Sequence, residues 1–219
     1  NNVRIFESQL EEFEVEKIDL EVLLFQTGYL TIQSERMVGI KYQYVLSVPN
    51  LEVRMGLTDY LFSMFYANAL TANERTRFSE KIYFALAENR PKDVEQIFRA
   101  FFSSIPPDWY RKNNIAHFEG FYSALFYAVF AALGLTAIPE DPMNKGRMDL
   151  SVIMENAVFI FEFKMKTNPK NALQQIKELK YYEKYQADNK QIYLIGIEFD
   201  EDERNISMFE CEKLVTHLG

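Results

Sequence analysis

An acid and a lysine interrupt an otherwise apolar segment near the middle of the second half of the chain. Glu162 and Lys164 lie within Ala157–Met165, whose composition predicts a β-strand. Residues two apart in a strand share a face, so Glu162 and Lys164 should lie side by side. The opposite face is predicted to be hydrophobic, and it carries Phe159, Phe161, Phe163 and Met165. An exposed ion pair at a sheet edge, worth at most about 1 kcal/mol, is the alternative interpretation.

A second carboxylate precedes this pair in the segment Gly146-Arg147-Met148-Asp149. If residues 148–155 form the preceding strand of a hairpin, Met148, Leu150 and Val152 should share one face and Asp149 the other. Asp149 and Glu162 would then converge beside Lys164. Two carboxylates with open coordination positions suit Mg²⁺ or Mn²⁺ together with phosphate oxygens. Lys164 would position a water molecule or stabilise developing negative charge, at a mostly solvated site.

Glu119 is a third carboxylate of interest, because it lies in a nearly apolar helical segment. Burying a lone carboxylate costs several kcal/mol, so Glu119 should be exposed, paired or bound to a ligand.

The second half of the chain reads as an α/β layer structure. A helix over residues 113–133, closed by Gly134, precedes three predicted strands, and an amphipathic helix separates these from two more. The predicted strands cover 135–139, 148–155, 157–165, 191–199 and 206–211, and the amphipathic helix covers 171–186.

The first half reads as a small mixed subdomain followed by helices. A helix over 18–25, a strand over 42–48 and extended residues Leu51–Arg54 indicate a winged-helix-like arrangement. Residues 58–104 have helical periodicity, with Asp93 as a candidate helix cap. Pro106-Pro107 marks the predicted boundary between residues 1–105 and 106–219.

Composition limits the classes of function. The 219 residues carry a formal net charge of −8, one Cys and two His, which argues against a generally basic nucleic-acid binder and excludes a cysteine zinc cluster. No Gly-rich phosphate loop, signal peptide or membrane span is legible, so a cytoplasmic protein, plausibly a piece of a longer one, is expected. Residues 145–190 are locally basic, with nine Lys or Arg against six Asp or Glu. Lys177, Lys180 and Lys184 have helical spacing and would either follow a phosphate backbone or form a solvated helix face.

Taken together, these residues resemble the PD-(D/E)XK nuclease superfamily. The likeness rests on Glu119, Asp149 and Glu162-Phe163-Lys164 in order, within an α-β-β-β-α-β succession of elements. The helix with Ala172–Ile176, followed by Lys180-Tyr181-Tyr182, is similar to that of the restriction-endonuclease-like branch. Further upstream, Leu24–Ile32 and Val48–Arg54 resemble the end of a predicted AAA-type ATPase that precedes such domains in bacterial proteins.

The resemblance implies a role for each matching residue. Asp149 and Glu162 would be metal ligands together with the main-chain carbonyl of Phe163, and Lys164 would be the catalytic lysine. Glu119 would reach the metal directly or through water. Gln175 and Tyr181 match the helix positions that face the site. From their own positions, Lys180 is a further candidate for substrate contact, and Arg147, beside Asp149, would either meet a phosphate or be a surface residue. One departure is that Met148 stands where the family often has Pro before the Asp.

Two hypotheses of function follow from the sequence. The first is a Mg²⁺- or Mn²⁺-dependent nuclease, most simply one acting on DNA, within a larger ATPase-containing protein. The second is a catalytically silent nuclease fold that serves as an interaction or regulatory module beside an ATPase. The joint presence of Asp149, Glu162 and Lys164 favours the enzyme, whereas the acidic net charge favours the module.

Overall fold

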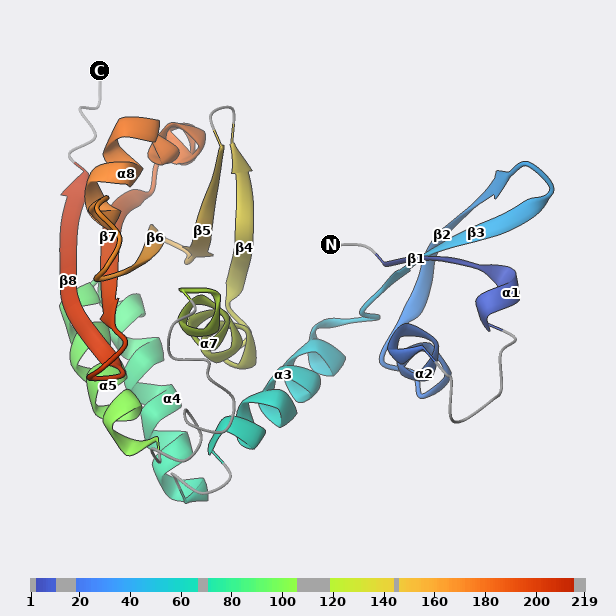
Figure 1. The fold of residues 1–219 in the computed structure, drawn as a ribbon, viewed down its shortest axis with the longest axis horizontal. Helices are drawn as coiled ribbons and strands as arrows, with labels where there is room; N and C mark the ends of the chain where they lie inside the picture. Colours follow the sequence, from blue (N-terminus) through green and yellow to red (C-terminus); the bar gives the residue numbers. More distant parts are fainter. Residues whose placement is uncertain (1–2, 11–18, 67–70, 106–118, 144–145, 215–219) are drawn as a thin grey trace. The chain divides into compact units, whose positions relative to one another are not determined.

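The fold was examined in a computed structural model, which describes residues 3–10, 19–66, 71–105, 119–143 and 146–214 (Figure 1). The chain divides into two compact units, Asn1–Thr58 and Asp59–Gly219. Each unit is described separately below. The predicted boundary at Pro106-Pro107 and the predicted helical residues 113–118 lie outside the described residues.

The first unit is a three-stranded antiparallel sheet with two helices. Its strands are β1 (Val3–Phe6), β2 (Thr31–Val38) and β3 (Lys41–Ser47), in the order β1-β3-β2. Its helices are α1 (Glu7–Leu10) and α2 (Leu20–Gln26), and Val22 of α2 is buried. The winged-helix-like interpretation of this unit stays a prediction.

The prediction of extended structure at Leu51–Arg54 is wrong, because these residues form the first turn of α3 (Leu51–Tyr66). The side chain of Asn50 accepts a hydrogen bond from the Val53 main-chain N–H at 2.9 Å. Asn is a strong helix N-cap residue, so Pro49-Asn50 marks a helix start here.

The second unit begins with two helices that pack against a sheet, α4 (Ala72–Ala87) and α5 (Pro91–Ser104). A capping box between Thr71 and Glu74 starts α4. Pro91 occupies the first turn of α5 and Arg90 is its N-cap, so Asp93 lies inside the first turn and is not the cap.

The predicted order of elements in the rest of this unit is confirmed. Helix α7 (Glu119–Ala132) leads into a five-stranded sheet, ordered β4-β5-β6-β7-β8, in which only the β6–β7 pair is parallel. Helix α8 (Ala172–Leu179) and the 3₁₀ segment η1 (Tyr181–Asp188) connect β6 to β7. The strands are β4 (Thr136–Met143), β5 (Gly146–Ile153), β6 (Ala157–Met165), β7 (Gln191–Asp200) and β8 (Asn205–Leu214).

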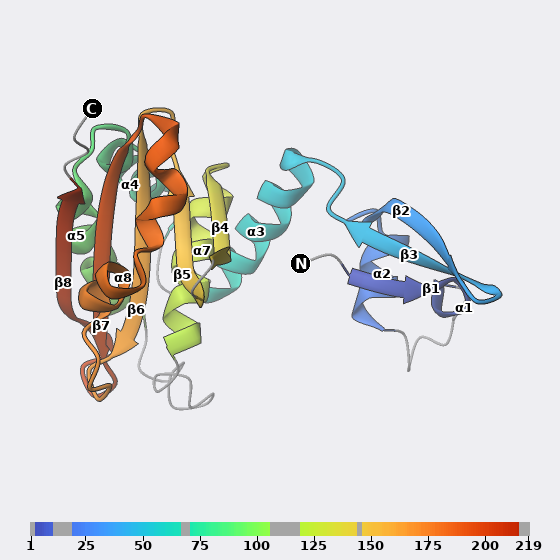
Figure 2. The ribbon, with the colours of Figure 1, turned by 90° about the horizontal axis from the view of Figure 1, so that it is seen from above.

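Helices cover both faces of this sheet (Figure 2). Phe159, Phe161 and Phe163 of β6 share one core cluster with residues of α4, α5 and α7. Val158 and Ile160 of β6 lie in a second cluster with residues of α8 and η1. The predicted division of β6 into two faces is therefore correct, and α4 and α5 belong to the same core as the sheet.

Two local predictions differ from the structure. Helix α8 stops at Leu179 because Lys180 adopts a left-handed conformation with φ of 54°, so the predicted helix over 171–186 is a shorter helix plus a 3₁₀ segment. Met148 packs in the cluster with α8, whereas Leu150 and Val152 pack in the other cluster. The alternation fails opposite Glu140, a non-glycine residue with positive φ on β4.

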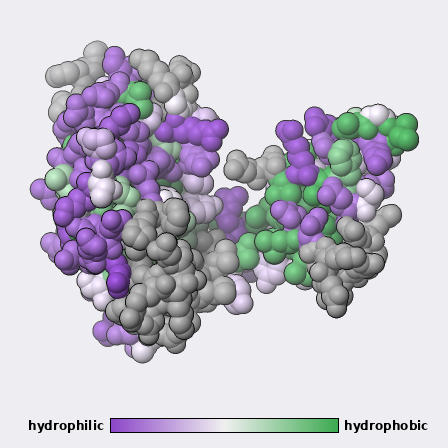
Figure 3. Space-filling model, in the orientation of Figure 1, coloured by the Kyte–Doolittle hydropathy of each residue, from purple (hydrophilic) through white to green (hydrophobic). Residues whose placement is uncertain are grey.

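In the view of Figure 3 the described surface of the second unit is mostly polar, whereas hydrophobic residues show over much of the first unit, the β2–β3 hairpin included. The hairpin exposes Met37, Val38 and Ile40. No helix among the described residues is long and apolar enough to cross a membrane.

Candidate active site

The charged pair lies on the central strand of the five-stranded sheet. All nine residues of β6 are buried, and β5 and β7 pair with it on either side. Glu162 is 1% exposed and Lys164 is 7% exposed. The edge ion-pair interpretation and the expectation of a mostly solvated Lys164 are therefore both wrong.

The Lys164 ammonium contacts oxygens from two elements. Its Nζ lies 3.0 Å from Glu162 Oε1, 2.9 Å from the Phe163 carbonyl oxygen and 3.4 Å from Glu119 Oε1. Glu119 is the first described residue of α7, and its side chain is one third exposed. The start of α7 and the carboxyl end of β6 therefore meet around one positive charge.

Asp149 reaches the same end of β6 from β5. Its Oδ2 accepts a hydrogen bond from the Phe163 main-chain N–H at 2.8 Å. The β5–β6 ladder ends at the pair Leu150↔Phe161, so Asp149 lies just beyond the regular pairing. A carboxylate here takes over a main-chain donor that the ladder leaves unpaired.

Helix α8 contributes a polar side chain to the site. Gln175 Nε2 donates a hydrogen bond to Glu162 Oε1. Burial, followed by the negative charge of Glu162, raises the pKa of the Tyr181 hydroxyl. Glu162 pairs with Gly196 on β7, where a Cβ atom would lie 2.8 Å from the Leu173 Cα. The missing side chain at Gly196 allows α8 to approach the sheet closely enough for Gln175 to reach Glu162.

Burial and mutual repulsion perturb the carboxyl groups of the site. Burial, followed by the negative charge of Asp149, raises the pKa of Glu162 to about 7. Burial also raises the pKa of Asp149 and of Glu119. For Lys164, burial by itself lowers the pKa, but the neighbouring carboxylates, Glu162 first, raise it overall.

The donor set fits a hard divalent cation with several open positions. Glu162 Oε2 is buried and has no hydrogen-bond partner in the described part of the chain, which leaves a carboxylate oxygen available to a ligand. Among the described residues, no group of three His, Cys, Asp or Glu side chains could hold a metal ion. Mg²⁺ and Mn²⁺ sites often use one or two carboxylates, with waters and phosphate oxygens completing the shell. Lys164 occupies the Phe163 carbonyl and Glu162 Oε1, so a cation using these atoms requires the ammonium to move.

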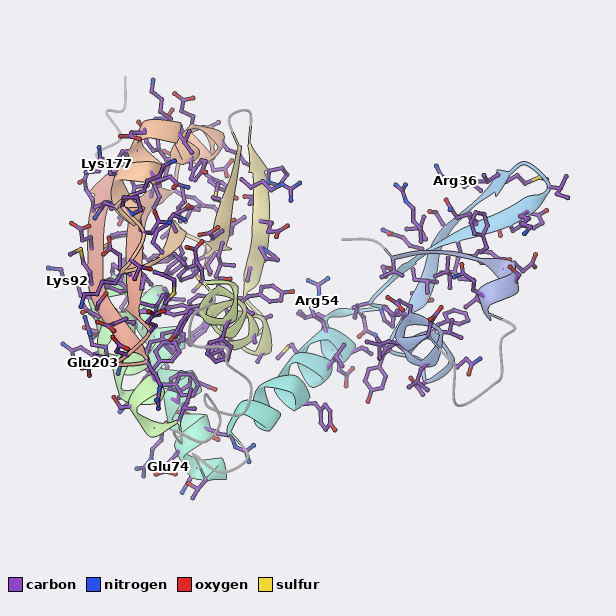
Figure 4. All side chains as sticks on the ribbon, viewed as in Figure 1. Arg36, Arg54, Glu74, Lys92, Lys177 and Glu203 are labelled. Carbon is purple, nitrogen blue, oxygen red and sulfur yellow. The ribbon has the colours of Figure 1, made fainter. Side chains whose placement is uncertain are left out.

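The remaining predicted substrate contacts are exposed and pair with carboxylates outside this cluster. Arg147 is exposed and pairs with Glu140 at 3.1 Å, and Lys180 pairs with Glu183 at 3.6 Å. Lys184 pairs with Asp141, and Lys177 pairs with Glu212 of β8; Figure 4 shows Lys177 on α8 beside β8. The lysines at helical spacing thus each contact a carboxylate.

Two features of the site's surroundings were missed from the sequence. Gly196, a single glycine inside an apolar strand, is a recognised signal of close backbone approach. Asp141 is 1% exposed and accepts hydrogen bonds from Ser151, Tyr185 and Lys184. Asp141 lies between two prolines, Pro139-Glu140-Asp141-Pro142, which gives no sequence signal of a buried strand.

Comparisons with known proteins agree with this geometry. Residues 117–209 match a family model described as "PD-(D/E)XK nuclease superfamily". The chain is 41% identical over 207 residues to the "Uncharacterized protein in vnfD 5'region" of Azotobacter chroococcum mcd 1. That match covers 94% of this chain and 40% of the relative, so the chain spans less than half of the relative's length. No solved structure matches the chain. Residues 117–209 are therefore a PD-(D/E)XK nuclease superfamily domain with a restriction-endonuclease-like fold.

Proposed function

We propose that this domain is a Mg²⁺- or Mn²⁺-dependent nuclease that hydrolyses phosphodiester bonds of DNA in the cytoplasm. The observation that carries the proposal is the buried Glu162, which has one unpartnered oxygen and lies among Asp149, Lys164 and Glu119. A buried carboxylate that lacks a partner is costly, so its presence at the end of a central strand calls for a ligand.

Each residue has a role in the proposed reaction. Asp149, Glu162 and the Phe163 carbonyl would hold the cation, which when bound polarises a phosphodiester and lowers the pKa of a water molecule. Lys164 would stabilise charge on the phosphoryl oxygens or orient the attacking water when displaced from the Phe163 carbonyl. Glu119 accepts from Lys164 and would guide that displacement. Gln175 holds the Glu162 carboxylate in orientation through Oε1.

Arg147, Gln175, Tyr181 and Lys180 are proposed as the residues nearest the substrate. Gln175 is supported by its hydrogen bond to Glu162, and Tyr181 by the effect of the Glu162 charge on its pKa. To bind phosphate, Arg147 would have to break its ion pair with Glu140, and Lys180 its ion pair with Glu183. Such an exchange involves exposed ion pairs, which contribute little to stability, so it costs little.

The test is cleavage of single- and double-stranded DNA and RNA, each with Mg²⁺, Mn²⁺ or EDTA. We expect cation-dependent cleavage of DNA by the wild-type protein and none by Asp149→Asn. Tyr193→Phe is the control for effects of substitution and purification that do not involve the site. It removes a hydroxyl hydrogen-bonded to Gln191 and leaves Asp149, Glu162 and Lys164 unchanged. Equal cleavage by wild type and Asp149→Asn would show that the activity comes from elsewhere.

An interaction module is the second candidate, favoured by the charge arrangement around the site. Carboxylates pair with Arg147, Lys166, Lys177, Lys180 and Lys184, which reduces the basic surface available to phosphates. If the wild-type protein cuts nothing with either cation yet binds a protein partner, this second function replaces the first.

We also propose that the whole protein contains an ATPase region that works with this domain. The support is the resemblance of Leu24–Ile32 and Val48–Arg54 to the end of such a region, and the greater length of the relative. ATP hydrolysis by the full-length protein, with and without DNA, is the measurement that tests this context.

A further inference from the structure

A second buried carboxylate lies on the same side of the sheet as Glu162 and is bonded at both of its oxygens. Asp141 Oδ2 accepts from Ser151 Oγ at 3.0 Å and from the Tyr185 hydroxyl, and Asp141 Oδ1 accepts from Lys184 Nζ. Ser151 Oγ and the Tyr185 hydroxyl are themselves 2.9 Å apart. These four residues are called the Asp141 cluster below.

The Asp141 cluster joins three elements around the segment that carries Asp149. Asp141 lies on β4, Ser151 on β5, and Lys184 and Tyr185 on η1. Ser151 follows Asp149 by two residues on β5, and the side chain of Ser151 faces η1 through Tyr185. At the start of the same strand, a Cβ atom on Gly146 would lie 3.5 Å from the Tyr181 hydroxyl. Residues 146–151 thus lie close to η1 at both ends, and the Ser151 end is also hydrogen-bonded to it.

Strand pairing is interrupted at Asp149 itself. The ladder to β6 ends at Leu150↔Phe161, and the ladder to β4 contains no pair for Asp149, since it passes from Pro139↔Leu150 to Asp141↔Met148. The main chain at Asp149 is therefore held through its neighbours: Met148 and Leu150 are paired in the ladders, and the Asp141 cluster holds Ser151. A buried carboxylate with three donors is a costly means of packing three elements, which an apolar group of similar size would also join.

From this arrangement we infer that the Asp141 cluster is a positioning device that sets where Asp149 lies relative to Glu162. It rests on the proposed function, because Asp149 and Glu162 are the proposed cation ligands. Asp141, Ser151 and Tyr185 act through β5 and need not touch substrate or cation. Residues that orient metal ligands from outside the coordination shell typically change metal affinity by 10- to 100-fold when removed.

The experiment measures Mn²⁺ affinity by calorimetry in Tyr185→Phe and in the matched control Tyr193→Phe. Both changes delete one tyrosine hydroxyl that forms a hydrogen bond, but the Tyr193 hydroxyl bonds Gln191 at the other end of β7. We expect Mn²⁺ binding about tenfold weaker in Tyr185→Phe and unchanged in Tyr193→Phe. Ser151→Ala is the second variant, and its effect should be less than additive with Tyr185→Phe because both donors bind the same oxygen.

Backbone amide exchange at Phe163 supplies a readout that needs no cation. The Phe163 N–H donates to Asp149, so loosening the Asp141 cluster should speed its exchange while the Leu150–Phe161 ladder stays protected. Unchanged Phe163 exchange together with unchanged Mn²⁺ affinity would overturn the inference. If the wild-type protein binds no Mn²⁺, the proposed function fails, and Phe163 exchange alone then decides whether the Asp141 cluster positions Asp149.

Discussion

Asp141 and Glu162 are two carboxylates on one side of one sheet, both almost fully buried, with opposite states of bonding. Asp141 accepts from two hydroxyls and a lysine, and both of its oxygens are bonded. Glu162 receives two donors on Oε1, while its Oε2 has no partner within the described residues. A buried carboxylate whose two oxygens both accept hydrogen bonds holds neighbouring elements together. One with an unpartnered oxygen can still bind a ligand.

The lysines that pair with these two carboxylates differ in the same way. The Lys184 side chain is 39% exposed, and the Lys164 side chain is 9% exposed. Lys184 can leave Asp141 with two other donors in place. Lys164 carries the positive charge for three oxygens of the candidate site at once. The comparison agrees with the proposed structural role of the first pair and the proposed chemical role of the second.

Removal of each carboxylate charge gives the largest expected contrast. Glu162→Gln should abolish the rise in melting temperature caused by Mn²⁺ and lower cleavage by on the order of a thousandfold, because a cation is worth several kcal/mol in the transition state. Asp141→Asn should retain cation binding at reduced affinity. Thermal melts with and without Mn²⁺, together with a cleavage assay, check both variants. An equal Mn²⁺ effect in wild type and Glu162→Gln would remove the basis of the comparison.

Removal of each lysine should give the next largest contrast. Lys164→Ala should lower cleavage about a hundredfold. It should also lower the unfolding free energy by about 3 kcal/mol at pH 8, since it leaves the Glu162 carboxylate buried without the Lys164 ammonium. It should tighten Mn²⁺ binding as well, because Glu162 Oε1 and the Phe163 carbonyl each lose the ammonium as a donor.

Lys184→Ala is the matched control for that variant and should cost less than about 1 kcal/mol, because its ion pair is partly solvated. Urea unfolding and Mn²⁺ calorimetry measure these quantities. Weaker Mn²⁺ binding by Lys164→Ala than by wild type would contradict the displacement of the ammonium by the cation.

The pKa of Glu162 predicts a smaller, pH-dependent effect. Its folded-state pKa of about 7 exceeds the ordinary value of 4.5, so the folded protein holds a proton that the unfolded chain has already released. The contribution of Glu162 to stability is complete below about pH 4.5 and is lost as the pH rises to about 7. The difference in unfolding free energy between wild type and Glu162→Gln should therefore fall from pH 5 to pH 8. A pH-independent difference would show that Glu162 is ionised in the fold throughout.

The smallest expected effects belong to the exposed basic residues. Arg147→Ala and Lys180→Ala should each change stability by less than about 0.5 kcal/mol, because their partners Glu140 and Glu183 are also exposed. Each should weaken DNA binding a few-fold. Each should also reduce the slope of the logarithm of the binding constant against the logarithm of the salt concentration by about 1. Fluorescence anisotropy at several salt concentrations measures this. An unchanged salt slope would remove these residues from the proposed substrate contacts.

The sequence predicts β6 and its neighbours well because the signal there is local. The alternation of Phe159, Phe161 and Phe163 with Glu162 and Lys164 follows directly from strand geometry, and both faces agree with the structure. The burial of Lys164 could not be predicted in the same way, because it depends on where β5, β7 and α7 pack around β6. The break in alternation at Met148 likewise depends on Glu140, whose positive φ is not encoded by a glycine.

At the first unit and at α8, the errors arise from competing local signals. Pro49-Asn50 is compatible with a turn or a helix cap, and only the bond from Val53 decides for the helix. Helical periodicity continues through Lys180 in the sequence, although the backbone turns left-handed there. The Asp141 cluster joins residues 44 positions apart, and hydrophobic periodicity predicts local structure and no contact at that separation.

The two charges of β6 also matter before the chain is folded. Ala157–Met165 contains β-branched and aromatic residues, has no proline, and has Glu162 and Lys164 as its charged residues. Short segments of this composition pair with copies of themselves when exposed, and charges within them oppose that association. We therefore expect Glu162 and Lys164, the proposed catalytic residues, also to oppose aggregation during synthesis and refolding. Inactive variants for binding studies should therefore neutralise one of the two charges at a time, because Glu162→Gln combined with Lys164→Met would leave the whole strand uncharged.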